Sequence, residues 1–78
     1  SWPRAETPTH FISMGLDADL DEAARLATQE MIDFLVRDVG MDRDDAYVLC
    51  SVALDLRVTQ VVDGTKAVHG MLAKSVFR

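Results

Sequence analysis

Several features that identify common classes of protein are missing from this sequence. It has no HxH, no CxxC, no glycine-rich phosphate loop and no serine nucleophile elbow. Its single cysteine, Cys50, cannot form an internal disulfide and stands among apolar residues, where a small buried thiol is expected. No apolar run approaches the roughly 20 residues of a bilayer span, and nothing reads as a signal peptide. We therefore expect a cytoplasmic protein that does not enter a membrane.

Basic residues are also few. Lys and Arg number 8 against 13 Asp and Glu, which gives a net charge of −5. Residues 17–45 hold ten of the acidic residues and only three of the basic ones. An acidic surface repels phosphate, and the sequence has no Lys/Arg cluster with interleaved aromatic residues, so we expect no nucleic-acid partner. The charge is better explained as the solvated face of helices.

The composition indicates one small folded unit over residues 1–78. Hydrophobic residues make up 49% of the chain and charged residues 27%, which is typical of a globular protein and not of a disordered one. A unit of this size buries only about 60 to 65% of its unfolded surface, so its core is marginal. The sequence begins at Ser1 without a methionine, which indicates processing, an end chosen by design or a fragment of a longer polypeptide.

The strongest periodic pattern predicts a helix over residues 19–39. Apolar side chains return every three or four positions and form one face, while charged side chains form the other. The predicted core face consists of Leu20, Ala23, Ala24, Ala27, Met31, Phe34 and Leu35. Asp19 and Glu22 have the spacing of a capping box, and Gly40 suits a left-handed residue after the helix. We also expect ion pairs four residues apart, between Asp21 and Arg25 and between Asp33 and Arg37.

A second helix is predicted over residues 42–54. Asp42 is a good N-cap, and the two acidic residues that follow it suit the first turn of a helix. From Ala46 to Leu54 only Ser51 is polar, so this helix should be covered on most sides. A chain of 78 residues can hardly provide that cover, which again suggests that a larger body is missing.

The remaining elements are predicted to be strands. Residues 1–8 read as an irregular extended lead-in, residues 9–14 as a strand that Gly15 ends, and residues 56–72 as a β-hairpin with a turn at Asp63-Gly64. The predicted fold class is α+β, with an αα-hairpin packed on a small, mostly antiparallel sheet of about three strands. The other face of the sheet would be uncovered, so we expect the unit to be part of a larger domain.

Glu6 and His10 are the first candidates for chemistry. A carboxylate and an imidazole can bind a metal ion or share a proton transfer. In an extended chain their spacing spans roughly 13 Å, so they converge only if the backbone turns. The alternative is a polar loop residue followed by a histidine at a strand edge.

A second polar group lies around the predicted hairpin. Arg57, Thr59 and Asp63 share a face if the strand is regular, and Asp55 is spaced to meet Arg57 on one side. A buried ion pair that braces the junction between helix and strand is as good an explanation as a substrate clamp. His69 is more readily explained as a hydrogen-bonded sheet residue than as a ligand.

Two stretches taken together, residues 2–36 and 44–77, resemble the C-terminal portion of the acetamidase/formamidase family. The more specific parts of the resemblance are the segment ETPTH at Glu6–His10, DLDEA at the start of the first helix, DDAY at Asp44–Tyr47, and DLRVTQVVD at Asp55–Asp63. The last of these carries the most weight, because its pieces are common singly but not in this order.

The resemblance implies an oligomeric cytoplasmic enzyme that hydrolyses formamide or acetamide to the acid and ammonia. It also implies a divalent metal ion, zinc or calcium, and an N-terminal part of the protein that holds most of the metal-site residues. Glu6 would serve as metal ligand or base, His10 would be the second catalytic residue, and residues 1–78 alone would be inactive. The competing hypothesis is a non-catalytic α+β module that binds a protein partner through the uncovered face of its sheet.

Overall fold

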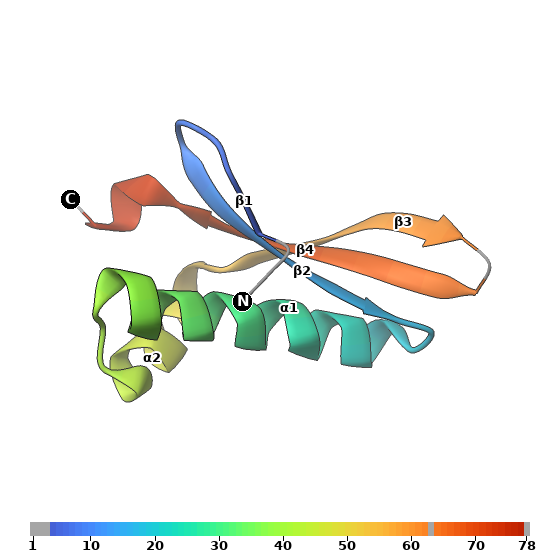
Figure 1. Cartoon of the computed structure of the whole chain (residues 1–78), viewed down its shortest axis with the longest axis horizontal. Coiled ribbons are helices and arrows are strands. Elements are labelled where there is room, and N and C mark those ends of the chain that lie inside the picture. Colours follow the sequence, from blue (N-terminus) through green and yellow to red (C-terminus); the bar gives the residue numbers. More distant parts are fainter. Residues whose placement is uncertain (1–3, 63, 78) are drawn as a thin grey trace.

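The computed structural model describes residues 4–62 and 64–77, and within them the side chains of 5–59 and 64–77. The chain forms a sheet with helices on one side (Figure 1). In order, the elements are β1 (Arg4–Glu6), β2 (His10–Asp17), α1 (Leu20–Phe34), a π-helical turn η1 (Leu35–Val39), α2 (Arg43–Ala53), β3 (Asp55–Val62), β4 (Thr65–Ala73) and a 3-10 turn η2 (Lys74–Phe77).

The sheet is antiparallel throughout and has the strand order β1-β2-β4-β3. The α+β class is therefore confirmed, and the sheet has four strands where the sequence predicted about three. The additional strand is β1, which lies in the segment expected to be an irregular lead-in. Pro8 falls in the turn after β1, so it removes no backbone donor from the pairing of Ala5 with Ile12.

β2 runs past Gly15 to Asp17, so the prediction that Gly15 ends this strand is wrong. Gly15 pairs with Val68 of β4 in the middle of the sheet. A Cβ atom at this position would lie 2.0 Å from the carbonyl oxygen of Ala23 and 2.6 Å from the amide nitrogen of Ala27. The glycine is required because the backbone of α1 touches the backbone of β2 there.

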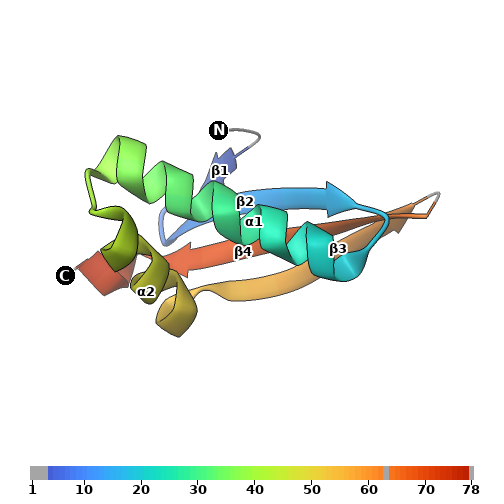
Figure 2. The ribbon, with the colours of Figure 1, turned by 90° about the horizontal axis from the view of Figure 1, so that it is seen from below.

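The main core lies between α1 and the two central strands, and Figure 2 shows α1 running along β2 and β4. Its fully buried side chains include Met31 and Leu35 from the helical side and Leu72 from β4. A smaller cluster of Ala23, Ala27 and Val68 fills the narrow part near Gly15. The predicted core face of the first helix is thus largely confirmed, except that Leu20 is 39% exposed.

The ends of the helices follow the sequence signals only in part. The Asp19 side chain accepts a hydrogen bond from the Asp21 amide at 2.8 Å, so the N-cap is confirmed. Glu22 does not complete a capping box, because its carboxylate binds Arg25 at 2.6 Å. That contact also takes Arg25 away from the expected pair with Asp21. After α1 the helix widens into the π-helical turn η1. This turn ends at Gly40, whose φ of 86° confirms the predicted left-handed residue.

α2 begins at the predicted cap and covers little of the sheet. The Asp42 side chain accepts from the Asp44 amide at 3.1 Å. The helix packs beside α1 at one end of the molecule (Figure 2). Tyr47 is 62% exposed and Val52 is 82% exposed. The cover expected for this helix is therefore not provided by the part of the chain that the structure describes.

An ion pair joins the two helices and replaces the expected pair of Asp33 with Arg37. Asp33 accepts hydrogen bonds from Arg43 and from Gln29, each at 3.1 Å. Burial raises the pKa of Asp33, but these two hydrogen bonds and the positive charges of Arg43 and Arg37 together lower it by more. The net pKa of Asp33 is below its ordinary value, so its carboxylate stabilises the folded state.

Replacing Arg43 with methionine is expected to lower the free energy of unfolding by about 0.5 kcal/mol at pH 7, as for a partly exposed ion pair. The folded pKa is depressed, so this contribution is present above the ordinary value of 3.8 and is lost as the pH falls through the folded pKa. Urea unfolding at pH 7 and pH 2 measures the difference. Arg37→Met is the control, for which we expect a smaller loss of unfolding free energy. If Arg43→Met lowers the unfolding free energy equally at both pH values, the stabilisation does not come from the Asp33 carboxylate.

Candidate functional site

The turn between β1 and β2 carries the residues that the sequence singled out. The hydroxyl oxygen of Thr7 accepts hydrogen bonds from the amides of His10 at 3.0 Å and Thr9 at 3.3 Å. The Thr7 amide donates to the carbonyl oxygen of His10 at 2.9 Å. The chain therefore does reverse its direction between Glu6 and His10, and the threonine hydroxyl holds the turn closed.

Glu6 forms an ion pair with Lys74, the first residue after β4. The Lys74 ammonium donates to the Glu6 carboxylate and lies 5.0 Å from the centre of the Phe11 ring. The Lys74 amide donates to the carbonyl oxygen of Thr9 at 2.8 Å, which fixes the start of η2 against the turn. Sequence reasoning missed Lys74. The antiparallel pairing of β4 with β2 could have indicated it. The end of β4 lies beside the start of β2, so the residue that follows β4 must lie next to the β1–β2 turn.

Glu6 and His10 lie on opposite faces of the sheet. Glu6 pairs with Phe11 in the β1–β2 register, and Phe11 packs on Phe34 of α1 with ring centroids 4.8 Å apart. His10 precedes Phe11 in the same strand and so points to the other face, where its Nδ1 lies 2.8 Å from the Thr9 hydroxyl oxygen. The structure does not bring the two candidate side chains together, and their catalytic roles stay predictions.

A hollow of about 280 Å³ lies beside the turn. It is lined by Pro8, Thr9, His10, Ala73, Lys74 and Ser75. His10 is part of the wall, whereas Glu6 reaches this region only through its bond to Lys74. An imidazole and an ammonium are therefore the ionisable groups that border the hollow.

The described residues do not form a divalent metal site by themselves. Within residues 4–62 and 64–77, no three His, Cys, Asp or Glu side chains lie together in a way that could hold a metal ion. The Lys74 ammonium beside Glu6 would also repel a cation. A zinc or calcium ion, as expected from the resemblance, would need most of its ligands from outside this part of the chain.

The second polar group is arranged differently from the prediction. Asp55 accepts from Arg57 Nε at 2.9 Å and from Nη2 at 2.8 Å, so the expected pair forms. Both side chains are more than half exposed, so the pair is not a buried brace. The β3–β4 register shifts between Val58 and Gln60, so β3 is not the regular strand on which a shared face depended. Asp63 lies outside the described residues.

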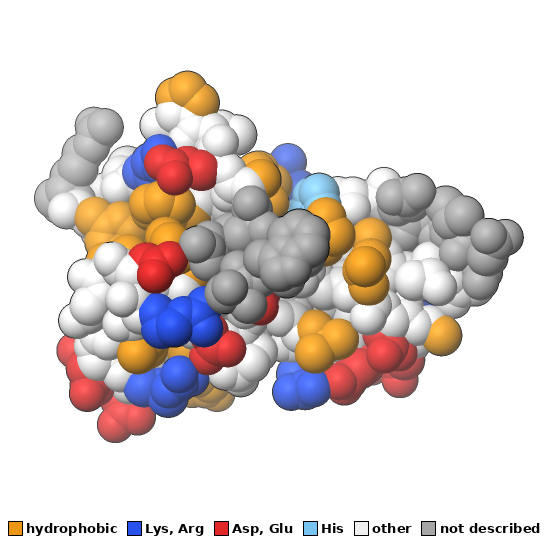
Figure 3. All heavy atoms as spheres, in the orientation of Figure 1, with side chains coloured by type: hydrophobic (Ala, Val, Ile, Leu, Met, Phe, Trp, Pro, Cys, Tyr) orange, Lys and Arg blue, Asp and Glu red, His pale blue; other side chains and the backbone are white. Residues whose placement is uncertain are grey.

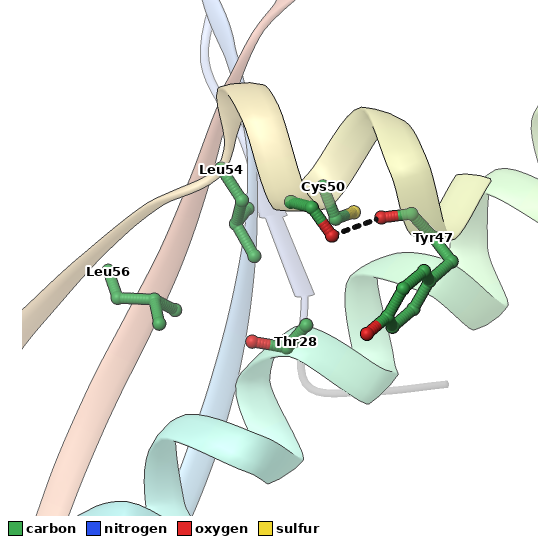
Figure 4. Close-up of a pocket in the computed structure, with 6 residues that line it drawn as sticks. Thr28, Tyr47, Cys50, Leu54 and Leu56 are labelled. Carbon is green, nitrogen blue, oxygen red and sulfur yellow. Dashed lines mark hydrogen bonds between the residues drawn. The ribbon is translucent and has the colours of Figure 1, made fainter. Parts of the chain in front are cut away.

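A second hollow, which we call the β3 groove, opens between α1, α2 and β3. Its volume is about 300 Å³, and its lining residues are Thr28, Tyr47, Cys50, Ser51, Leu54 and Leu56. Figure 4 shows Leu54, Leu56 and Thr28 around one space, with the Tyr47 ring at its side. Cys50 is 5% exposed, so the predicted buried thiol is confirmed, and burial raises the pKa of that thiol.

Charge is unevenly distributed over the surface. In Figure 3 most of the visible acidic side chains lie in the lower half of the view, where the helices lie. This agrees with the prediction that the acidic residues form a solvated helical face. Within the residues that the structure describes, the helices are too short and too polar to cross a bilayer.

The fold and the turn define a two-layer α+β unit in which one long helix packs on an antiparallel sheet. Two solved acetamidases contain the same unit with 36% sequence identity. One, from Bacillus halodurans, superposes with a TM-score of 0.85 over 97% of this chain, and the other, from Yersinia enterocolitica, with 0.91 over 100%. A predicted acetamidase/formamidase from Thermoanaerobacter tengcongensis shares the fold at 19% identity, with a TM-score of 0.82 over 95% of this chain.

These 78 residues therefore form a segment of the acetamidase/formamidase family fold, which confirms the resemblance found in the sequence. The chain spans only 26%, 24% and 25% of those three structures, respectively. Neither a protein-family model nor a curated protein matches the sequence.

Proposed function

We propose that this chain is the C-terminal part of an enzyme that hydrolyses short-chain linear amides to the carboxylic acid and ammonia. The observation that carries the proposal is the 36% identity to two acetamidases over 97 and 100% of the chain. The remaining N-terminal part of the protein would complete the active site, and we expect residues 1–78 alone to be inactive. We further propose a homo-oligomeric enzyme of the cytoplasm.

The residues at the β1–β2 turn fit the edge of such an active site better than its centre. Amide hydrolysis needs a base that takes a proton from water and an acid that protonates the departing nitrogen. His10 borders a hollow large enough for formamide or acetamide, and its Nε2 is the ring nitrogen not engaged with Thr9. Glu6 is an acceptor whose charge Lys74 balances. We assign His10 to proton transfer and Glu6 to positioning Lys74 at the wall of the hollow.

Ammonia release from formamide and acetamide tests the proposed activity. The assay compares residues 1–78 with the same protein extended to its natural N-terminus. Activity in the extended protein alone is the expected result. If both are silent toward both amides, the family fold still stands but the proposed reaction is wrong.

Glu6→Gln in the extended protein is expected to lower kcat/KM for the amide at least about tenfold, because a neutral amide cannot hold the Lys74 ammonium in place. Stability should change little, since the Glu6 side chain is 61% exposed. Glu22→Gln is the matched control, because it removes another partly exposed carboxylate paired with a cation, on α1. Full activity of Glu6→Gln would show that Glu6 has no role in the active site.

A further inference from the structure

Half of the large apolar side chains that are exposed among the described residues lie on two neighbouring elements, α2 and β3. Leu56 is 43% exposed and Val58 is 55% exposed. Both pair with β4 residues, Gly70 and Val68, that are buried on the helical side of the sheet. α1 covers β2 and β4 but leaves β3 to one side (Figure 2). The helical side of β3 therefore has an apolar surface without a helix over it.

The competing hypothesis placed a partner on the opposite, open face of the sheet. On that face Ile12, Met14 and Met71 are only partly exposed, and Leu16 at 52% is the one large apolar side chain of the described strands that is clearly exposed. The more extensive exposed apolar surface lies on the helical side, along β3 and α2. A docking site is therefore better supported there than on the open face.

The β3 groove also suits an apolar occupant by its chemistry. The Thr28 hydroxyl donates to the carbonyl oxygen of Ala24 at 2.9 Å, and the Ser51 hydroxyl donates to that of Tyr47 at 2.9 Å. Figure 4 shows the second of these bonds. Because both hydroxyl donors are already used within their own helices, the wall does not depend on a polar ligand to satisfy them.

The outer edge of β3 offers backbone pairing next to this apolar surface. β3 is the last strand in the described sheet and is hydrogen-bonded only to β4 there. A long edge strand with apolar side chains is the usual site at which another strand is added. The bulge between Val58 and Gln60 divides β3 into two regularly paired halves, and the first of them, Asp55–Val58, lies beside the groove.

We propose that the β3 edge and the β3 groove receive an extended, apolar strand from the part of this protein that corresponds to the rest of the acetamidase chains. Those chains are about four times as long as this one, so about three quarters of the family fold lies outside the 78 residues. A second copy of this chain is the alternative occupant, and the oligomeric state of the 78-residue chain distinguishes it from the missing strand. Docking of the strand requires the family fold but not amide hydrolysis.

The test uses a chimera in which residues 1–78 replace the matching segment of the Bacillus halodurans acetamidase. Val58→Lys is made in the chimera and in the 78-residue chain. The expected result is a fall in Tm of about 5 °C or more in the chimera, where the lysine would be covered, and of less than about 2 °C in the chain alone. Val39→Lys is the matched control, since Val39 is 42% exposed at the end of η1 and should change neither Tm.

Two results would overturn the proposal. The first is an equally small effect of Val58→Lys in both proteins. The second is a dimeric 78-residue chain that Val58→Lys converts to a monomer, which would make a second copy the occupant. If the chimera does not fold, light scattering measures binding of the chain to the separately produced remainder of that acetamidase. Val58→Lys should then weaken binding at least about tenfold, and absent or equal binding would count against the proposal.

Discussion

Gly15→Ala is expected to destabilise the chain by about 3 kcal/mol or more, which is a large part of the stability of a domain of this size. The added Cβ would lie 2.0 Å from the Ala23 carbonyl oxygen and 2.6 Å from the Ala27 amide nitrogen. Both are backbone atoms of α1, so no side-chain rotation relieves the contact. The helix would have to move away from β2, and the packing of the alanine-rich cluster would be lost with it.

Gly70→Ala is the matched control, on the neighbouring strand and the same face of the sheet. Its new Cβ would meet the Ser13 hydroxyl oxygen at 2.7 Å and a Leu54 methyl at 3.4 Å, and both are side-chain atoms that can move. We expect a loss near 1 kcal/mol, because Ser13 would give up its bond to the Ala27 carbonyl. Urea unfolding measures both variants. Equal losses would mean that close contact of the backbones does not determine residue 15.

Leu72→Ala is expected to cost about 3 kcal/mol in the free energy of unfolding. Leu72 is fully buried and belongs to the main core cluster together with Met31, Phe34 and Leu35. Removing most of its side chain loses transfer free energy and leaves a cavity between the sheet and two helices, which cannot close it without moving.

Leu56→Ala serves as the control for this second variant. It removes the same atoms from the adjacent strand, where the side chain is 43% exposed, so we expect a loss below about 1 kcal/mol in the isolated chain. Thermal and urea unfolding give the two values. Similar losses would show that the core is not centred on β4.

The features that the sequence predicted well depend on neighbouring residues. The helix over residues 20–34, its cap at Asp19, the left-handed Gly40 and the cap at Asp42 each follow from a local pattern. The hairpin of β3 and β4 was also within one residue of its predicted limits. These local preferences are realised in the structure because the tertiary packing favours the same conformations.

The features that were missed depend on residues distant in the sequence. β1 is only three residues long and shows no alternation by which it could be recognised. The need for glycine at position 15 comes from α1, and the partner of Glu6 is Lys74, which is 68 residues away in the sequence. Arg43 reaches Asp33 from the second helix, and the i,i+4 spacing of ion pairs within one helix cannot predict such a contact. Candidate site residues could therefore be named from sequence, but not their faces or partners.

The strand order has a consequence for the time course of folding. β4 lies between β2 and β3, so neither of these strands has its central neighbour until β4 is present. On the ribosome β4 is made after both helices, so α1 emerges well before half of the surface on which it packs. The nascent chain then exposes two unpaired strand edges and the apolar face of α1, a state prone to aggregation. Because the β2–β4 pairing joins residues far apart in the sequence, we expect it to form slowly and to limit the rate at which the whole unit folds.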